Sequence, residues 1–123
     1  MEHDTEYYDK HHQQLFEFVW LPTFERTAKG LLSEDDKRNI ERTLCERLDA
    51  GSVMRRTGGL RKLRHPLPGG GKSGGARVIY RPNEACGRVY MILAYAKGTM
   101  DNLTREQENE LRKLSRELAR EDC

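Results

Sequence analysis

The residues with the clearest chemical potential are the cations in the middle of the chain. Residues 51–98 contain ten lysines and arginines but only one acidic residue, Glu84. A field of one sign attracts a polyanion, because each phosphate contact releases condensed counterions and the field steers the approach of the ligand. This segment therefore predicts a nucleic-acid partner. A basic surface kept only for solubility is the simpler alternative.

Cations of this kind can cleave RNA without a protein nucleophile, because RNA supplies its own 2′-hydroxyl beside the scissile phosphate. Arginine can neutralise the developing phosphorane, since its guanidinium donates two parallel hydrogen bonds to phosphate oxygens. A lysine surrounded by other cations can exchange a proton closer to neutral pH. The catalytic candidates are Lys62, Arg64, Arg77 and Lys97. The candidates for RNA binding are Arg55, Arg56, Arg61, Lys72, Tyr80 and Tyr95.

The sequence offers few signals for other chemistry. It has no Glu–His pair, no residues with metal-ligand spacing and no nucleophile elbow, so we expect neither a cofactor nor a metal. His65 is the only histidine near the basic residues, and we expect it at the surface end of a strand rather than as a general base. Gly71-Lys72-Ser73 is not a phosphate-binding P-loop, because Pro66 stands where that motif needs its first glycine. This glycine-rich stretch is either a nucleic-acid clamp or a plain hairpin connection.

Helices are expected at both ends of the chain and strands in its middle. Alternating aromatic residues indicate the first strand, and helix caps and apolar spacing indicate the helices. The expected elements are a strand at 16–20, helices from Pro22 and from Ser33 to Gly51, strands at 60–64, 76–81 and 89–96, and a helix capped by Thr104 and Gln107. The order β-α-α-β-β-β-α predicts an α+β fold, with a small antiparallel sheet packed with helices. We expect one domain over residues 14–123, after a disordered extension at residues 1–13.

The alternation of side chains along the strands predicts that the catalytic cations converge. On the first basic strand, Lys62 shares a face with Leu60 and Arg64. On the last strand, Lys97 follows four residues of one face, Val89, Met91, Leu93 and Tyr95. Arg77 begins the strand between them. Three or four cations are therefore expected on one patch of the sheet, with the two tyrosine candidates available to stack on bases.

Several motifs occur in the order typical of one protein family. They are Thr57-Gly58-Gly59-Leu60-Arg61-Lys62-Leu63-Arg64, then Gly71-Lys72-Ser73-Gly74-Gly75-Ala76-Arg77-Val78-Ile79-Tyr80, then Tyr90 to Lys97, then Asn102-Leu103-Thr104. This pattern resembles the RelE/HigB family of type II toxin–antitoxin systems, and in particular its HigB branch. The resemblance implies a microbial RNase fold and an mRNA endoribonuclease that usually cuts on the translating ribosome. It also implies a cognate antitoxin, commonly a helix-turn-helix protein in this branch.

The resemblance also implies roles for individual residues. Lys62 corresponds to a basic strand position used in catalysis, Arg77 to the phosphate-stabilising arginine, and Lys97 to the basic position that closes the last strand. RelE has a further lysine at the position of Leu60 and an arginine at that of Gly98. The cations available to replace them are Arg61, Arg64 and Lys72.

Two other functional classes remain open. Proteins of the ParE type share the fold but inhibit DNA gyrase through protein contacts. A non-catalytic module for RNA or DNA would bind in a salt-sensitive way and release no product. A cleavage assay separates both classes from an endoribonuclease.

The N-terminus and the cysteines indicate where the protein works. The acidic start of the chain lacks a secretory signal, and no apolar run reaches the roughly 18 residues of a membrane span. Three widely spaced cysteines, Cys45, Cys86 and Cys123, predict reduced thiols. These features predict a cytoplasmic protein without membrane contact.

Overall fold

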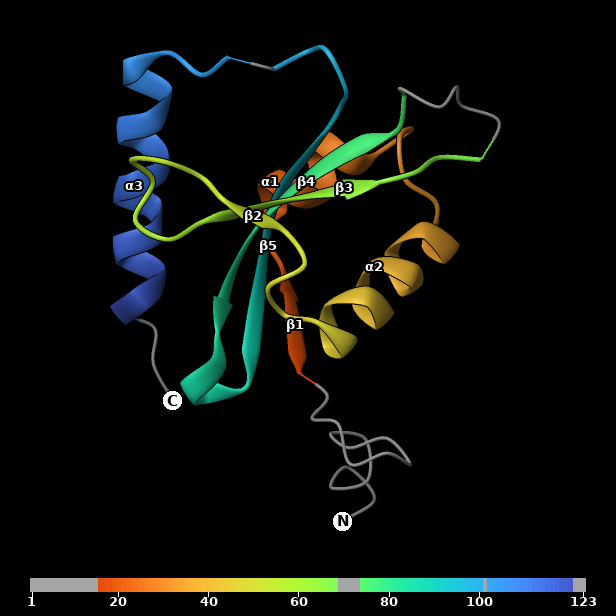
Figure 1. Cartoon of the computed structure of the whole chain (residues 1–123), viewed down its shortest axis with the longest axis horizontal. Helices are drawn as coiled ribbons and strands as arrows, with labels where there is room; N and C mark the ends of the chain where they lie inside the picture. The colour runs from red at the N-terminus through yellow and green to blue at the C-terminus, as the bar shows by residue number, and fades with distance from the viewer. Residues whose placement is uncertain (1–15, 69–73, 101, 121–123) are drawn as a thin grey trace.

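The computed structural model describes residues 16–68, 74–100 and 102–120, and within them the strands form one five-stranded sheet (Figure 1). The elements are β1 (Glu17–Trp20), α1 (Pro22–Ala28), α2 (Glu34–Glu46), β2 (Ser52–Val53), β3 (Arg61–His65), β4 (Ala76–Asn83), the 3-10 helix η2 (Glu84–Cys86), β5 (Arg88–Ala96) and α3 (Arg105–Arg120). The predicted α+β class is confirmed. The extension predicted at residues 1–13 lies outside the described residues.

The sheet is mixed rather than antiparallel, which corrects the predicted topology. Its strand order is β1-β5-β4-β3-β2, and β1 runs parallel to β5. The other three pairings are antiparallel. Parallel neighbours need a long connection, and here the two helices and the rest of the sheet separate β1 from β5 along the chain. The two-residue strand β2 was not predicted, because it is too short to give a periodic signal.

The helices pack on both faces of the sheet, and Figure 1 shows α2 and α3 on opposite sides. One core contains Phe24 of α1 and two residues of α2, packed on residues of the strands. The other core contains Leu111 and Leu118 of α3, packed on Ile79, Tyr90 and Ile92. Each helix thus buries its apolar stripe against one face of the sheet.

A β-bulge in β5 changes which side chains share a face. Ile79 pairs with Leu93, but the next residue of β4 pairs with Met91, so Ile92 is the extra residue. Met91 lies in the core beneath α1 and α2, whereas Leu93 packs against the core beneath α3. The prediction that Val89, Met91, Leu93 and Tyr95 share one face is therefore wrong. An inserted residue reverses the alternation of side chains between the two faces of the sheet. Counting every second residue in the sequence cannot detect such an insertion.

Two predicted helix starts are confirmed by their capping hydrogen bonds. At α2, the Ser33 hydroxyl accepts from the Asp36 backbone at 3.0 Å, and the Asp36 carboxylate accepts from the Ser33 backbone at 2.8 Å. At α3, Thr104 and Gln107 form the same reciprocal pair, with distances of 3.0 and 2.9 Å. Such a capping box satisfies two backbone donors that a helix start otherwise leaves unpaired.

Gly51 does not end α2 as predicted, because the helix stops at Glu46. Gly51 is instead buried where the chain passes over the sheet. A Cβ at this position would lie 2.8 Å from the Tyr80 ring and 2.9 Å from the Lys62 backbone. The close approach of two backbones thus explains this glycine.

Cys86, in η2, is part of a disulfide, and Cys45, in α2, is partly buried. The prediction of reduced thiols is therefore wrong for Cys86. Disulfides are uncommon in a reducing cytosol, so cysteine usage gives no support to the predicted cytoplasmic location. Within the described parts of the chain, no helix is both long enough and apolar enough to cross a bilayer.

Candidate functional site

β3 and β4 bring three of the predicted catalytic cations to one face of the sheet. In the register of these strands, Lys62 is opposite Ile79, and Arg64 is opposite Arg77. Ile79 belongs to the core beneath α3. Because side chains alternate along a strand, Lys62, Arg64 and Arg77 also project on the α3 side.

These three cations line a hollow of about 450 Å³, which we call the β3 hollow. Its lining residues are Ala50, Ser52, Lys62, Leu63, Arg64 and Arg77. Within the part of the chain that the structure describes, β2 pairs with β3 only at Arg61 and Lys62, so the rest of β3 has no strand neighbour on this side, and the hollow lies there. Among the described residues, none of the three cations forms an ion pair with a carboxylate. Like charges directly opposite each other destabilise a sheet, so an anion in this hollow would relieve the repulsion between Arg64 and Arg77.

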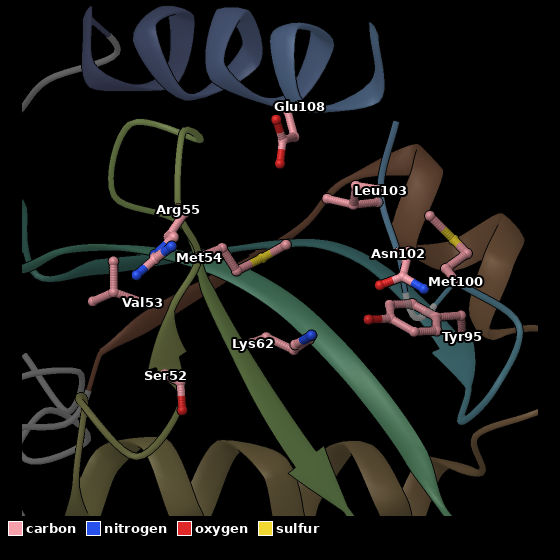
Figure 2. Close-up of a pocket in the computed structure, with 10 residues that line it drawn as sticks. All are labelled: Ser52, Val53, Met54, Arg55, Lys62, Tyr95, Met100, Asn102, Leu103 and Glu108. Carbon is pink, nitrogen blue, oxygen red and sulfur yellow. The ribbon is translucent and has the colours of Figure 1, made fainter. Parts of the chain in front are cut away.

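A second cavity, of about 420 Å³, lies between the sheet and the first turn of α3, and we call it the α3 cavity (Figure 2). Its lining residues are Ser52, Val53, Met54, Arg55, Lys62, Tyr95, Met100, Asn102, Leu103 and Glu108. Ser52 and Lys62 line both this cavity and the β3 hollow. In Figure 2 the Lys62 ammonium lies over the sheet on the side of Tyr95, and the Glu108 carboxylate points from α3 toward the sheet. The two hollows therefore adjoin each other at Ser52 and Lys62.

The turn that carries Met54 and Arg55 is joined to α3 by one hydrogen bond, and α3 is joined to β4 by two. The Ser115 hydroxyl of α3 donates to the Gly58 carbonyl at 2.8 Å. The Arg81 Nε of β4 donates to the Ser115 hydroxyl at 3.1 Å and to its carbonyl at 3.2 Å. Gly58 has a φ of 76°, and a Cβ there would lie 3.2 Å from the Ser115 hydroxyl. The glycine pair after Thr57 thus lets this turn approach α3 and form one wall of the α3 cavity.

A family model described as the RelE toxin of the RelE/RelB toxin–antitoxin system matches residues 18–122. The matched range contains every element that lines the two cavities. The chain belongs to the RelE toxin family. Membership implies that the chain is the toxin of a toxin–antitoxin pair and has an antitoxin partner. The assignment to the HigB branch stays a prediction.

Both departures from the RelE pattern have structural reasons in this RelE-family chain. Leu60 is fully buried in the core beneath α3, where a lysine would lose its hydration without a partner. Gly98 follows β5 with a φ of 93°, a backbone conformation that an arginine would adopt only with strain. Neither position can supply a cation in this toxin.

Two residues predicted to bind RNA form hydrogen bonds that hold the chain around Gly51. Tyr80 is 0% exposed, and its hydroxyl donates to the Leu48 carbonyl at 2.7 Å and accepts from the Gly51 backbone at 2.9 Å. Burial raises the pKa of Tyr80. Arg61, opposite Tyr80 in the sheet, donates to the Gly51 carbonyl at 2.6 Å. The prediction that Tyr80 stacks on bases is therefore wrong, because its ring has no accessible face. The side chain of Arg61 lies on the opposite face of β3 from that of Lys62, and its role in RNA binding stays a prediction.

The remaining candidates lie in different places. Tyr95 and Arg55 line the α3 cavity, and the Tyr95 hydroxyl points into it (Figure 2). Arg56, in the same turn as Arg55, lies with its Nη1 3.8 Å from Glu108 Oε1. Lys97 is exposed just after β5 and lines neither hollow, so its convergence with the other three cations stays a prediction. Lys72 lies outside the described residues.

His65 is buried at the end of β3, which corrects its expected surface position. Its Nε2 lies 2.9 Å from Asp36 Oδ1, and both side chains are 9% exposed. Burial opposes ionisation of Asp36, but hydrogen bonds from His65 and Ser33 outweigh it and lower the pKa of Asp36. The pair therefore joins the start of α2 to β3, on the face away from the cations.

Replacing Asp36 with asparagine should remove a pH-dependent part of the stability. The lowered pKa means that the stabilisation is present above the ordinary value of 3.8 and is lost as pH falls through the lower folded-state value. We expect Asp36→Asn to lower the free energy of unfolding most above about pH 5, with the difference shrinking below pH 3.8. Urea unfolding at a series of pH values from above about 5 to below 3.8 measures this difference. A difference that persists undiminished in acid would assign the loss to packing rather than charge.

The main residue that the sequence did not reveal is Glu108. It is one of several carboxylates in an amphipathic helix, and nothing in the local pattern distinguishes it from Glu106 or Glu110. Only the packing of α3 over the sheet brings Glu108 to the cavity that Lys62 also lines. Asn102 was noted as part of a motif, but its place in the cavity also depends on this packing.

Proposed function

We propose that this RelE-family toxin is an mRNA endoribonuclease that uses the RNA 2′-hydroxyl as its nucleophile. The observation that carries the proposal is the β3 hollow, where Arg64 and Arg77 face each other and Lys62 lies beside them. This arrangement is unfavourable without a bound anion. A phosphodiester in the hollow supplies the missing negative charge, and its charge increases in the transition state.

The three cations suit the separate tasks of this reaction. The 2′-oxygen attacks the phosphorus, the bond from phosphorus to the 5′-oxygen breaks, and a 2′,3′-cyclic phosphate and a 5′-hydroxyl form. Arg77 and Arg64 donate to the non-bridging oxygens, where the negative charge develops. Lys62, fixed on a strand, is the candidate for transferring a proton to or from the reacting oxygens. No step requires a metal.

The proposed partners follow from this chemistry. The substrate is mRNA, and the translating ribosome presents it in a single-stranded form that the hollow can reach. The antitoxin that family membership implies is proposed to be a helix-turn-helix protein. The proposed location is the cytoplasm, because the ribosome is there.

The proposal is tested by adding the purified chain to translating ribosomes and mapping the RNA ends. We expect new 5′-hydroxyl ends within coding sequence, and growth arrest within minutes when the chain is expressed without its antitoxin. A gyrase supercoiling assay runs beside it. Loss of supercoiling without RNA cleavage would indicate a ParE-like toxin, and salt-sensitive RNA binding without product would indicate a non-catalytic module. Healthy growth with abundant folded protein would contradict any toxic activity.

A further inference from the structure

We propose that the α3 cavity is a subsite for a guanine base of the RNA and that Glu108 reads its edge. The inference rests on the proposed function and adds a base preference to it. The starting observation is a carboxylate in a site that is otherwise cationic. Glu108 would repel a phosphate, so the binding of phosphate alone does not explain its position.

The cavity has the chemistry that a nucleobase requires. Its volume of about 420 Å³ is within the range of small-ligand sites, roughly 300–1,000 Å³. Met54, Met100 and Leu103 supply apolar surface, and methionine adapts well to aromatic rings. Asn102 and Glu108 supply polar groups at the edge. Unstacked RNA bases are recognised in this way, with apolar contacts to the ring and hydrogen bonds to the Watson–Crick edge.

Glu108 retains acceptor capacity for a ligand. Its side chain is 17% exposed, and it lies 3.8 Å from Arg56 Nη1 and 4.0 Å from Arg105 Nε. Both distances exceed those of a hydrogen bond. Among the described residues, no side chain donates a hydrogen bond to this carboxylate. The two carboxylate oxygens therefore remain available to accept hydrogen bonds from a ligand.

Guanine is the base that a carboxylate matches best. Its Watson–Crick edge presents two adjacent donors, N1–H and N2–H₂, which can pair with the two carboxylate oxygens. Adenine and cytosine offer one exocyclic amine beside an acceptor, and uracil offers one ring N–H between two carbonyls. The Asn102 amide, on the same cavity, can donate to guanine O6.

The position of the cavity connects the base to the cleavage chemistry. Ser52 and Lys62 line both the α3 cavity and the β3 hollow. A nucleotide whose phosphate lies among Lys62, Arg64 and Arg77 can therefore place its base beneath α3. The preferred base should consequently occupy a fixed position relative to the cut.

Binding of the four nucleoside monophosphates to the full chain tests the subsite without requiring cleavage. We expect GMP to bind roughly fivefold to a hundredfold more tightly than AMP, CMP and UMP, the discrimination typical of a bidentate base contact. NMR shifts should centre on Tyr95, Asn102 and Glu108. Glu108→Gln should reduce the ratio of the affinity for GMP to that for the other nucleotides to near one. Glu106→Gln, the same change on the same helical turn but outside the cavity, should leave it intact.

A second control separates base reading from the shape of the turn. Arg56→Gln removes the same ion pair as Glu108→Gln. It should weaken the binding of all four nucleotides by the same factor and keep the preference for GMP. The subsite is refuted if wild-type protein binds the four nucleotides equally, if Glu108→Gln keeps the preference, or if Arg56→Gln abolishes it. GMP preference in a chain that cuts no RNA would support the subsite while contradicting the endoribonuclease. Cleavage of RNA with no guanine at a fixed position relative to the cut would support the endoribonuclease and contradict the subsite.

Discussion

Arg77→Ala should lower the single-turnover rate of RNA cleavage by roughly a hundredfold or more, the scale of losing one preorganised charge-stabilising donor. Arg77 lies opposite Arg64 in the sheet and lines the β3 hollow with Lys62. A guanidinium held on a strand needs little reorganisation when charge develops on the phosphorane. The rate at saturating protein, measured on ribosome-bound mRNA, isolates this chemical step from binding.

The matched control is Arg88→Ala at the other end of the sheet. Arg88 lies opposite Asn83, at the end of β4 that is far from Arg77. The Arg88 Nε lies 3.1 Å from Glu17 Oε1. Its loss should barely change cleavage. Arg77→Ala should also keep or raise the free energy of unfolding, because it removes a like-charge pair. Equal kinetic losses in both variants would mean that the basic segment acts only as a diffuse attractor for RNA.

The parts of the fold that could be predicted from the sequence depend on local signals. Ser33 with Asp36 and Thr104 with Gln107 marked two helix starts, since a capping box involves residues only three apart. Pro22 marked the start of α1, because its ring fixes a helical φ and its missing N–H costs nothing there. The α+β class followed from these starts and from the strands between them.

The features that could not be predicted depend on tertiary contacts. The bulge at Ile92 arises from the register between β4 and β5, and the parallel position of β1 arises from how the whole chain folds back. Gly51 resembles a helix end in sequence, yet it is a glycine because Tyr80 and the Lys62 backbone leave no room for a Cβ there. In each case a residue distant in sequence determines the outcome.

The same distinction between local signals and tertiary contacts applies to the residues of the candidate site. Charge clustering and strand alternation together predicted that Lys62, Arg64 and Arg77 meet, because both signals are local to two adjacent strands. Tyr80 and His65 were misplaced because their environments depend on α2 and the loop after it. Glu108 was missed because its role depends on how α3 packs over the sheet.

Lys62→Ala should reduce the cleavage step strongly while leaving affinity for RNA or the ribosome nearly unchanged. Lys62 pairs with Ser52 on one side and Ile79 on the other. Its backbone is therefore fixed between two strands, and its ammonium lines both hollows. A side chain held in this way can be placed against a reacting oxygen. Single-turnover rates and equilibrium binding, measured on the same variant, separate the two effects.

Lys72→Ala is the comparison that separates catalysis from binding. Lys72 lies outside the described residues, in a sequence rich in glycine, the residue that restricts the backbone least. Such a lysine suits contact with the RNA backbone better than proton transfer. We expect Lys72→Ala to weaken binding and lower the salt slope by about one, with cleavage at saturation nearly intact. If Lys72→Ala abolished the chemistry and Lys62→Ala only loosened binding, the reacting phosphate would lie near the glycine-rich segment, and the β3 hollow would be a binding groove.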